Sequence, residues 1–383
     1  MNFEPTMKQA VVRRTVRNFA EKRIAHLAAE MDAAACFPDE LAGEMALLDY
    51  FGLEIPPQYG GAGLDSVSCV MVIEELSRVS AAMGLCISVH NSVAAFPVYE
   101  FGNAYQRDVF LEPMARGKRI GTFCLTEPNA GSDASAIETL AIKNGDGYLL
   151  NGNKVFVTNG GVSGLNLVFA RQQVEKGQDY SVFMVESERA GVEKGAREEL
   201  MGMRANPVCS IVLHDCYVPL ENRLGDEGQG LKIALSSLNG GRIGIGAQAL
   251  GIAQASLDVS VKYTKERYQF GRTLCTFGGI KTVLAEMAIR IEASRLLVHR
   301  ASAMRHQRLP HIKEAAMAKL FASETAVDVA RKGLQIHGGY GYTKAYPIER
   351  YYRDAKVCEI YEGTSEIQRF VIAKSAMAEK KIS

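Results

Sequence analysis

The spacing of hydrophobic and polar positions divides the chain into three zones. Up to about residue 120, hydrophobic residues recur every three or four positions, which is the period of an amphipathic helix. The first such run comprises Met7, Val11, Val12, Val16, Phe19, Ala20, Ile24 and Leu27. A second helix is predicted after Pro38-Asp39, and a long apolar helical stretch from about 66 to 101. We therefore predict a first, all-helical domain over residues 1–120.

Between about 121 and 218 the pattern changes to alternation, which is the period of half-buried strands. The candidate strands are 120–126, 139–143, 148–150, 154–158, 166–170, 180–186 and 209–214. Turn signals separate them, among them Asn151-Gly152 and the segment 175–177. We predict a compact antiparallel barrel or sandwich within a middle domain over residues 121–227.

From about 228 onwards the helical period returns in four long segments. They are 228–267, 279–307, 311–335 and 347–358, the last continuing into 364–379. Alanine-rich faces such as 315–318 suit close antiparallel packing. The third domain, 228–383, is therefore predicted to be a helical bundle, and the fold class is α+β.

Composition and charge add little to this outline. The chain has 383 residues, 47% hydrophobic and 23% charged, which suits a globular protein of two or three domains. A net charge of +1 gives no field to attract nucleic acid or anionic membranes. We expect no membrane span, because no apolar run is expected to reach the required length. The amino terminus resembles neither a signal nor a transit peptide, so we expect a cytoplasmic protein of prokaryotic type. Dispersed cysteines and histidines predict no metal site.

One carboxylate near the carboxyl end is a candidate for chemistry. Residues 360–369 read IYEGTSEIQR and place Glu362 in a short break between two helical patterns. Ser365 and Gln368 have the spacing of a capping box, so a helix is predicted to restart there. Gly363 permits unusual backbone angles and close approach of a ligand. Glu362 is therefore either a general base beside an exposed amide or a solvated glutamate at a helix end.

Residues 360–369 resemble the carboxy-terminal signature of the acyl-CoA dehydrogenases. Residues 124–133, CLTEPNAGSD, and 335–342, QIHGGYGY, resemble two further signatures of that family, and the similar organisation covers essentially the whole chain. Residues 241–254, GRIGIGAQALGIAQ, look most like the short-chain, butyryl-type branch. The resemblance implies an N-terminal helical domain, a middle antiparallel β-barrel and a C-terminal four-helix bundle. It also implies FAD as the cofactor.

The resemblance assigns roles to particular residues. In the family, a glutamate at the Glu362 position removes the α-proton of an acyl-CoA thioester. Some branches take this base from an earlier helix, but this chain reads NGGR at 239–242, so Glu362 is the only candidate at either place. The implied substrate-binding residues are Ser132, Asn239, Arg242, Tyr361 and Gly363. The implied cofactor-binding residues are Phe123, Leu125, Thr126, Gly131, Ser132, Phe156, Thr158, Arg267, Phe270, Gln335, Gly338, Gly339, Thr364 and Glu366.

Part of this set implies an oligomer. Arg267 resembles an arginine that pairs with the FAD pyrophosphate of a neighbouring subunit, although alone it would be interpreted as a solvated helix-end residue. The turn at 335–339 resembles one that approaches FAD across a dimer interface, so a homo-oligomer, usually a tetramer built as a dimer of dimers, is implied. Two positions depart from the family: Phe156 stands where many relatives have Trp, and Gly278 where many have a Gln against the FAD adenosine. We expect altered adenosine contacts but no loss of FAD.

The implied reaction is α,β-dehydrogenation of a short or compact acyl-CoA, branched or cyclic groups included, to the trans-2-enoyl-CoA. Electrons would pass to an electron-transferring flavoprotein. The alternatives are a glutaryl-type dehydrogenase of dicarboxylic acyl-CoA, an oxidase, whose usual extra domain has no room in this sequence, and a non-catalytic flavoprotein on the same scaffold. Asn91 stands where relatives line the acyl pocket, or else it satisfies helix backbone.

Overall fold

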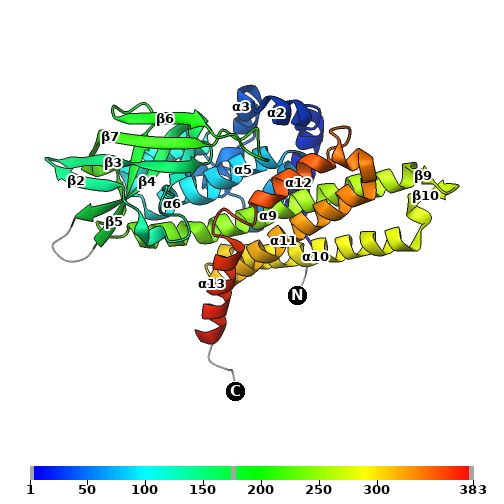
Figure 1. Cartoon of the computed structure of the whole chain (residues 1–383). Coiled ribbons are helices and arrows are strands. Elements are labelled where there is room, and N and C mark those ends of the chain that lie inside the picture. The colour runs from blue at the N-terminus through cyan, green and yellow to red at the C-terminus, as the bar shows by residue number, and fades with distance from the viewer. Residues whose placement is uncertain (1–3, 174–177, 379–383) are drawn as a thin grey trace, which may run out of the picture.

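Helices occupy both ends of the chain and strands occupy its middle (Figure 1). The computed structural model describes residues 4–173 and 178–378, so the predicted turn at 175–177 lies outside the described residues. The first helices are α1 (Met7–Phe19), α2 (Ala28–Ala34), α3 (Asp39–Leu47), α4 (Ser66–Val79), α5 (Ala81–Val89), α6 (Phe96–Phe101), α7 (Ala104–Gln106) and α8 (Glu112–Ala115). A π-helical segment, His90–Ala95, joins α5 to α6.

The helices α5 and α6 and the segment between them are apolar on nearly every face. The stretch Ala81–Phe101 is long and hydrophobic enough to cross a membrane, which corrects the prediction that no run has that length. In the structure 94% of its apolar window is buried inside the protein. Such burial is typical of a central helix of a globular core.

The strands form one eight-stranded sheet and a separate small hairpin. They are β1 (Ile120–Cys124), β2 (Leu140–Asn144), β3 (Gly147–Val157), β4 (Ser163–Gln173), β5 (Gln178–Glu186), β6 (Val192–Arg197), β7 (Cys209–Pro219) and β8 (Arg223–Leu224), and in the hairpin β9 (Tyr268–Gln269) and β10 (Arg272–Thr273). The strand order is β6-β7-β3-β2-β4-β5-β8, with β1 beside β4. Both β1 and β2 pair with β4 in parallel, so the sheet is mixed and not purely antiparallel as predicted. Alternation specifies which side chains face the core but not the direction of the neighbouring strand.

A predicted turn in this sheet is absent. The expected strands 148–150 and 154–158 form the single strand β3, and its register against β7 shifts between Leu150 and Gly152. Asn151-Gly152 therefore forms a bulge. A Cβ at Gly152 would lie 2.3 Å from Thr139 Oγ1, so the glycine is needed for close approach of the chain.

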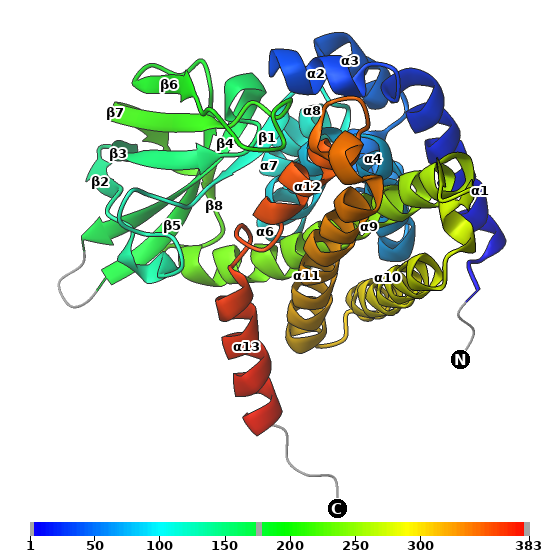
Figure 2. The same cartoon turned by 45° about the vertical axis from the view of Figure 1, so that its right-hand side comes forward.

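The C-terminal helices are α9 (Gly230–Glu266), α10 (Gly278–His306), α11 (Ile312–His337), α12 (Ile348–Val357) and α13 (Ser365–Ala378). Helix α9 runs from beneath the sheet to the β9–β10 hairpin, and α13 projects from the bundle (Figures 1 and 2). Glycines let α9 approach the first domain closely. A Cβ at Gly251 would lie 2.4 Å from the Glu74 carbonyl oxygen, and one at Gly244 would lie 2.3 Å from Ser88 Oγ.

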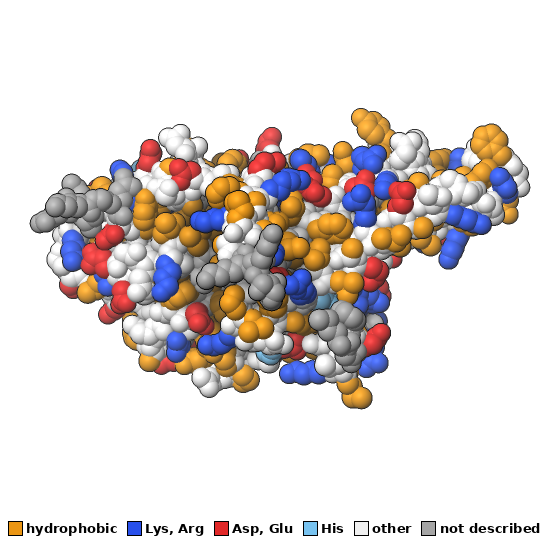
Figure 3. Space-filling view, turned by 90° about the horizontal axis from the view of Figure 1, so that it is seen from below, with side chains coloured by type: hydrophobic (Ala, Val, Ile, Leu, Met, Phe, Trp, Pro, Cys, Tyr) orange, Lys and Arg blue, Asp and Glu red, His pale blue; other side chains and the backbone are white. Residues whose placement is uncertain are grey.

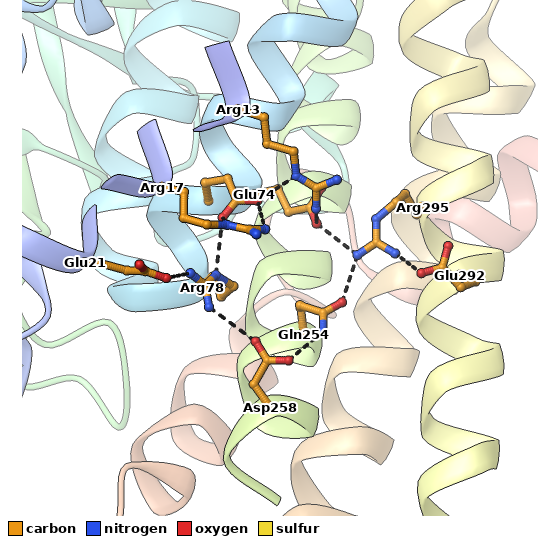
Figure 4. Close-up of polar contacts among 10 residues, drawn as sticks. Arg13, Arg17, Glu21, Glu74, Arg78, Gln254, Asp258, Glu292 and Arg295 are labelled. Atoms are coloured by element: carbon orange, nitrogen blue, oxygen red, sulfur yellow. Dashed lines mark hydrogen bonds and ion pairs between the residues drawn. The ribbon is translucent and has the colours of Figure 1, made fainter. Parts of the chain in front are cut away.

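Two buried carboxylates join α1, α4 and α10 (Figure 4). Glu75 accepts hydrogen bonds from Arg13 Nε at 2.7 Å and from Arg17 Nη2 at 2.6 Å. Glu74 accepts from Arg13 Nη2 at 3.1 Å and from Arg295 Nη2 at 3.0 Å. Burial by itself would raise the pKa of Glu75, but the hydrogen bonds from the two α1 arginines outweigh burial and lower it. The bonds from Arg13 and Arg17 to Glu75 therefore hold α1 most strongly while Glu75 is ionised.

Glu75→Gln should lower the free energy of unfolding by about 1–3 kcal/mol, because the buried side chain loses its charge-assisted hydrogen bonds from the partly exposed Arg13 and Arg17. The loss should be largest at neutral pH. It should disappear as the pH falls through the depressed folded-state pKa, since wild type then loses the same charge. Urea unfolding at several pH values measures this. Glu44→Gln, which breaks the exposed Arg23–Glu44 pair, is the control and should leave the free energy of unfolding nearly unchanged.

Candidate active site

A cavity of about 190 Å³ lies where all three parts of the chain meet. Its walls come from α5 and the π-helical segment, from β1, β3 and the loops after them, from the first half of α9, and from the break between α12 and α13 with the first turn of α13. It is lined by Leu85, Val89, Val93, Phe123, Leu125, Thr126, Gly131, Ser132, Ala134, Phe156, Thr158, Leu235, Leu238, Arg242, Ile245, Tyr361, Glu362, Gly363 and Ile367. Eleven residues from the predicted set, far apart in sequence, thus share one cavity.

Glu362 and Gly363 form a left-handed turn in the α12–α13 break. Their φ angles are +54° and +89°, and a non-glycine residue seldom adopts such an angle. The predicted capping box is wrong in detail: Thr364 Oγ1 accepts from Ile367 N, and the Gln368 side chain donates to the carbonyls of Glu362 and Gly363. Gln368 therefore supports the turn from the C-terminal side.

The carboxylate of Glu362 is held in the protein with little direct support. Its Oε2 is buried and has no hydrogen-bond partner among the described residues. Burial raises the pKa of Glu362 to about 7, although the nearby charges of Arg242 and Lys319 oppose the rise. Arg242 is itself buried and donates from Nη1 to Asn239 Oδ1 at 3.0 Å. The result is a carboxyl group that can change its protonation near neutral pH.

Gly241 provides the space for this carboxylate. A Cβ at Gly241 would lie 2.3 Å from Glu362 Oε2 and 2.7 Å from its Cδ. Any larger residue on α9 would therefore have to displace the carboxyl group. The sequence showed only that no acid stands at 240–242, and not that a glycine there is required sterically.

The loop after β1 is held by a buried ion pair that sequence reasoning missed. Lys154 on β3 has no exposed surface and donates from Nζ to Glu127 Oε1 at 2.6 Å and to the Leu125 carbonyl at 3.2 Å. Glu127 also accepts from Thr139 N at 3.0 Å. The loop carrying Thr126 and Ser132 is thus fixed to the sheet. The sequence did contain a signal for this pair, because Lys154 stands at a core-facing position of an alternating strand.

The wall formed by the sheet fits a flat ring. Phe156 has a φ of +54° and leaves 63% of its surface exposed, which an isolated aromatic on a core-facing wall seldom does. A Cβ at Gly131 would touch nothing within 4 Å, so the loop also leaves open space. The hydroxyls of Thr126, Ser132 and Thr158 line the same space and can hydrogen-bond the edge of a heteroaromatic ring. These residues fit a flavin.

Other predicted cofactor residues lie at a second cavity of about 500 Å³. Arg267, Gly338 and Gly339 line it, together with Tyr263 and Tyr340. Arg267 follows the C-terminal end of α9, whereas Arg242 at the first cavity lies about 25 residues earlier on that helix. At 1.5 Å per residue the two sites are roughly 37 Å apart within one chain.

The remaining predicted residues lie outside both linings. Phe270 and Gln335 are exposed near the second cavity. Thr364 precedes α13 and Glu366 lies in its first turn, and Asn239 accepts a hydrogen bond from Arg242 beside the first cavity. Asn91 satisfies backbone: it donates to the Tyr50 and Ile87 carbonyls and accepts from Leu53 N. Of the two readings of Asn91, the structural one is therefore observed.

Comparison with known proteins agrees with this architecture. Residues 6–118, 122–216 and 228–377 match the N-terminal, middle and C-terminal domains of acyl-CoA dehydrogenases. The chain is 44% identical over 374 residues to a short-chain specific acyl-CoA dehydrogenase of Clostridium acetobutylicum, covering 97% of this chain and 99% of that one. It belongs to the acyl-CoA dehydrogenase family, whose members are FAD-dependent oxidoreductases.

Two solved structures are particularly similar. Butyryl-CoA dehydrogenase from Megasphaera elsdenii is 41% identical with a TM-score of 0.97, covering 98% of this chain and 100% of that one. A chain in a structure described as the electron transferring flavoprotein of Acidaminococcus fermentans is 42% identical, also with a TM-score of 0.97, covering 99% and 100%. Within the family, the similarity is therefore strong to short-chain members.

Proposed function

We propose that this protein binds FAD and dehydrogenates a short or compact acyl-CoA, with Glu362 as the catalytic base. The observation that carries the proposal is the Glu362 carboxyl group, which opens on the cavity with no hydrogen-bond partner for Oε2 among the described residues. Its pKa of about 7 lets it be ionised at neutral pH and still accept a proton. A merely structural glutamate would be expected to have a partner.

The backbone beside the base supplies the second part of the chemistry. The N–H of Glu362 makes no hydrogen bond to another described residue, so it is free to donate to a thioester carbonyl. That hydrogen bond acidifies the α-carbon, and Glu362 removes the α-proton. Bound FAD would supply the acceptor for the β-hydride, and the product would be a trans-2-enoyl-CoA. We infer that Phe123, Leu125, Thr126, Gly131, Ser132, Phe156 and Thr158 hold the flavin ring.

The lining of the cavity favours a small, uncharged acyl group. Leu85, Val89 and Ile245 bring only hydrocarbon to it, and the similar proteins described above include a short-chain specific acyl-CoA dehydrogenase and a butyryl-CoA dehydrogenase. A dicarboxylic acyl group would bury a distal carboxylate, which is costly without a free cation, and Arg242 already acts on Glu362 and bonds Asn239. A short straight, branched or cyclic acyl chain fits better than a glutaryl group. We assign Ser132, Asn239, Arg242, Tyr361 and Gly363 to binding of the acyl-CoA.

The distance between the two cavities supports a homo-oligomer. One FAD cannot reach both in a single chain, so Arg267, Phe270, Gln335, Gly338 and Gly339 would bind the FAD of a second copy. Phe270 and Tyr342 are 92% and 88% exposed. Figure 3 shows hydrophobic side chains at the right-hand end of the molecule, where the β9–β10 hairpin lies. A dimer of dimers would cover them, and electrons would leave to an electron-transferring flavoprotein.

Anaerobic titration with acyl-CoA tests the proposed reaction. The purified FAD protein is mixed with butyryl-CoA, isobutyryl-CoA, a cyclic acyl-CoA and glutaryl-CoA, and bleaching of the flavin's visible absorbance is recorded. We expect bleaching by a short uncharged acyl-CoA and little by glutaryl-CoA. Full flavin occupancy with no bleaching by any of them would instead support a non-catalytic flavoprotein.

Gly241→Ala should slow bleaching about 100-fold, because displacement of a reacting group by about 1 Å can cost that much. The added methyl group would meet Glu362 Oε2, as described above. Gly240→Ala is the matched control: its Cβ would lie 3.3 Å from the Arg305 guanidinium, a much milder contact, and no atom of Glu362 is among its nearest neighbours. Both changes favour the helix equally, so equal bleaching rates in the two variants would contradict the steric role of Gly241.

A further inference from the structure

Lys319 is a buried cation beside the catalytic turn. It lies on α11 with no exposed surface and donates from Nζ to the Gly363 carbonyl at 2.8 Å. No carboxylate among the described residues lies within ion-pair distance of it. An ammonium group buried in this way is costly, and a lysine with only a packing role would be expected to be replaced by an apolar residue. Its position therefore calls for a specific interaction.

The Gly363 carbonyl is held from two sides. Lys319 Nζ reaches it from α11, and Gln368 Nε2 reaches it from α13 at 2.8 Å. Gln368 Nε2 also donates to the Glu362 carbonyl at 3.2 Å. These bonds oppose relaxation of a turn in which Glu362 has an unfavourable φ of +54°. The turn sets both the direction of the Glu362 side chain and that of its N–H.

Charge provides a second connection between the two residues. Burial lowers the pKa of Lys319 to about 8. The charge of Lys319 in turn opposes the rise that burial causes in the pKa of Glu362. The titratable and charged groups that act on Lys319 are Cys358, Glu359 and Glu362 in or next to the α12–α13 break and Arg242 on α9. Of these, Glu362 is the group that changes protonation in the proposed reaction.

We propose that Lys319 is a positioning residue for the base: its ammonium holds the Gly363 carbonyl, and thereby the Glu362 turn, and favours the ionised carboxylate. The inference rests on the proposed function, in which Glu362 removes the α-proton. No atom of Lys319 needs to touch the substrate. Its contribution is to keep the carboxylate against Gly241 and to keep the turn in which the Glu362 N–H makes no hydrogen bond to another described residue.

The test compares Lys319→Met, Lys319→Gln and wild type by the pH profile of anaerobic flavin bleaching. Lys319→Met removes the donor and the charge, so bleaching at pH 7 should slow about 30-fold or more, and the apparent pKa of the base should rise by about one unit. Lys319→Gln keeps a donor, so it should recover part of the rate but keep the raised pKa. Thermal unfolding is followed alongside.

Lys332→Met on the same helix is the control, because Lys332 pairs with Glu286 and Asp328 away from the turn. It should leave the pH profile unchanged. A purely structural role for Lys319 would lower the thermal midpoint without moving the profile of the flavin-bound protein, and that result in both variants would overturn the inference. If Lys319→Met does not fold, Lys319→Gln decides by the same criterion. If Glu362→Gln were bleached at the wild-type rate, that result would instead overturn the proposed function itself.

Discussion

Replacing Glu362 by glutamine should abolish bleaching of the flavin by acyl-CoA, with a rate at least about 1,000-fold below wild type, because general bases typically contribute 10² to 10⁴. The amide keeps the size and the N–H of the residue but cannot accept the α-proton. The cavity offers no substitute. Its other ionisable groups are Arg242 and Tyr361, and burial raises the pKa of the Tyr361 hydroxyl further above its ordinary value. Gly241 stands where an acid on α9 would be needed. FAD and acyl-CoA should still bind.

The measurement is a single-turnover bleaching rate under anaerobic conditions, together with a spectral titration that reports binding. Glu359→Gln is the matched control, since Glu359 lies three residues earlier and pairs with the half-exposed Lys356. It should bleach within about 3-fold of wild type, as expected when only a surface pair is lost. Comparable loss in both variants would mean that the break as a whole, and not the carboxylate, determines the rate.

Much of the fold follows from local periodicity. The change from a helical period to alternation near 120, and back near 228, predicts the order of helical, sheet and helical parts that the structure has. Strand direction does not follow, because it depends on which distant strand becomes the neighbour. The parallel pairing of β1 with β4 and the merging of two predicted strands into β3 are both effects of this kind.

The candidate site was predictable only where a motif carried it. Glu362 and the 124–133 loop were found through their sequence context, and the structure brings them to one cavity. Lys154 and Lys319 support them from other elements and were missed. A signal for Lys319 did exist: Ala315, Lys319, Ala322 and Ala326 follow the helical period, and all four are buried. A lysine within such a stripe indicates a polar partner across the interface.

The bleaching rate should rise with pH, about tenfold per unit, and level off above about pH 7, where Glu362 becomes ionised. A base must be unprotonated before it reacts, so activity is lost on the acid side of its pKa. At pH 5 the rate should be roughly 100-fold below the plateau. The measurement is kcat/KM against pH at limiting substrate, because this profile reports the pKa of the base in the free enzyme. A profile that is flat from pH 5 to 8 would contradict an ionisation near 7.

The raised pKa of Glu362 should make stability fall with pH over the range in which activity rises. Glu362 titrates higher in the folded protein than in the unfolded chain, so the folded state holds an extra proton between about pH 4.5 and 7. The stability that comes from holding this proton is therefore lost as the pH rises through this window. It stays lost at pH 8, where the folded protein must bury an ionised carboxylate. Glu362→Gln should unfold at a higher temperature than wild type at pH 8 and at nearly the same temperature at pH 4.5. A variant that loses activity and gains stability only at high pH would show that the buried charge of Glu362 lowers stability. The charge is then retained because the reaction needs it.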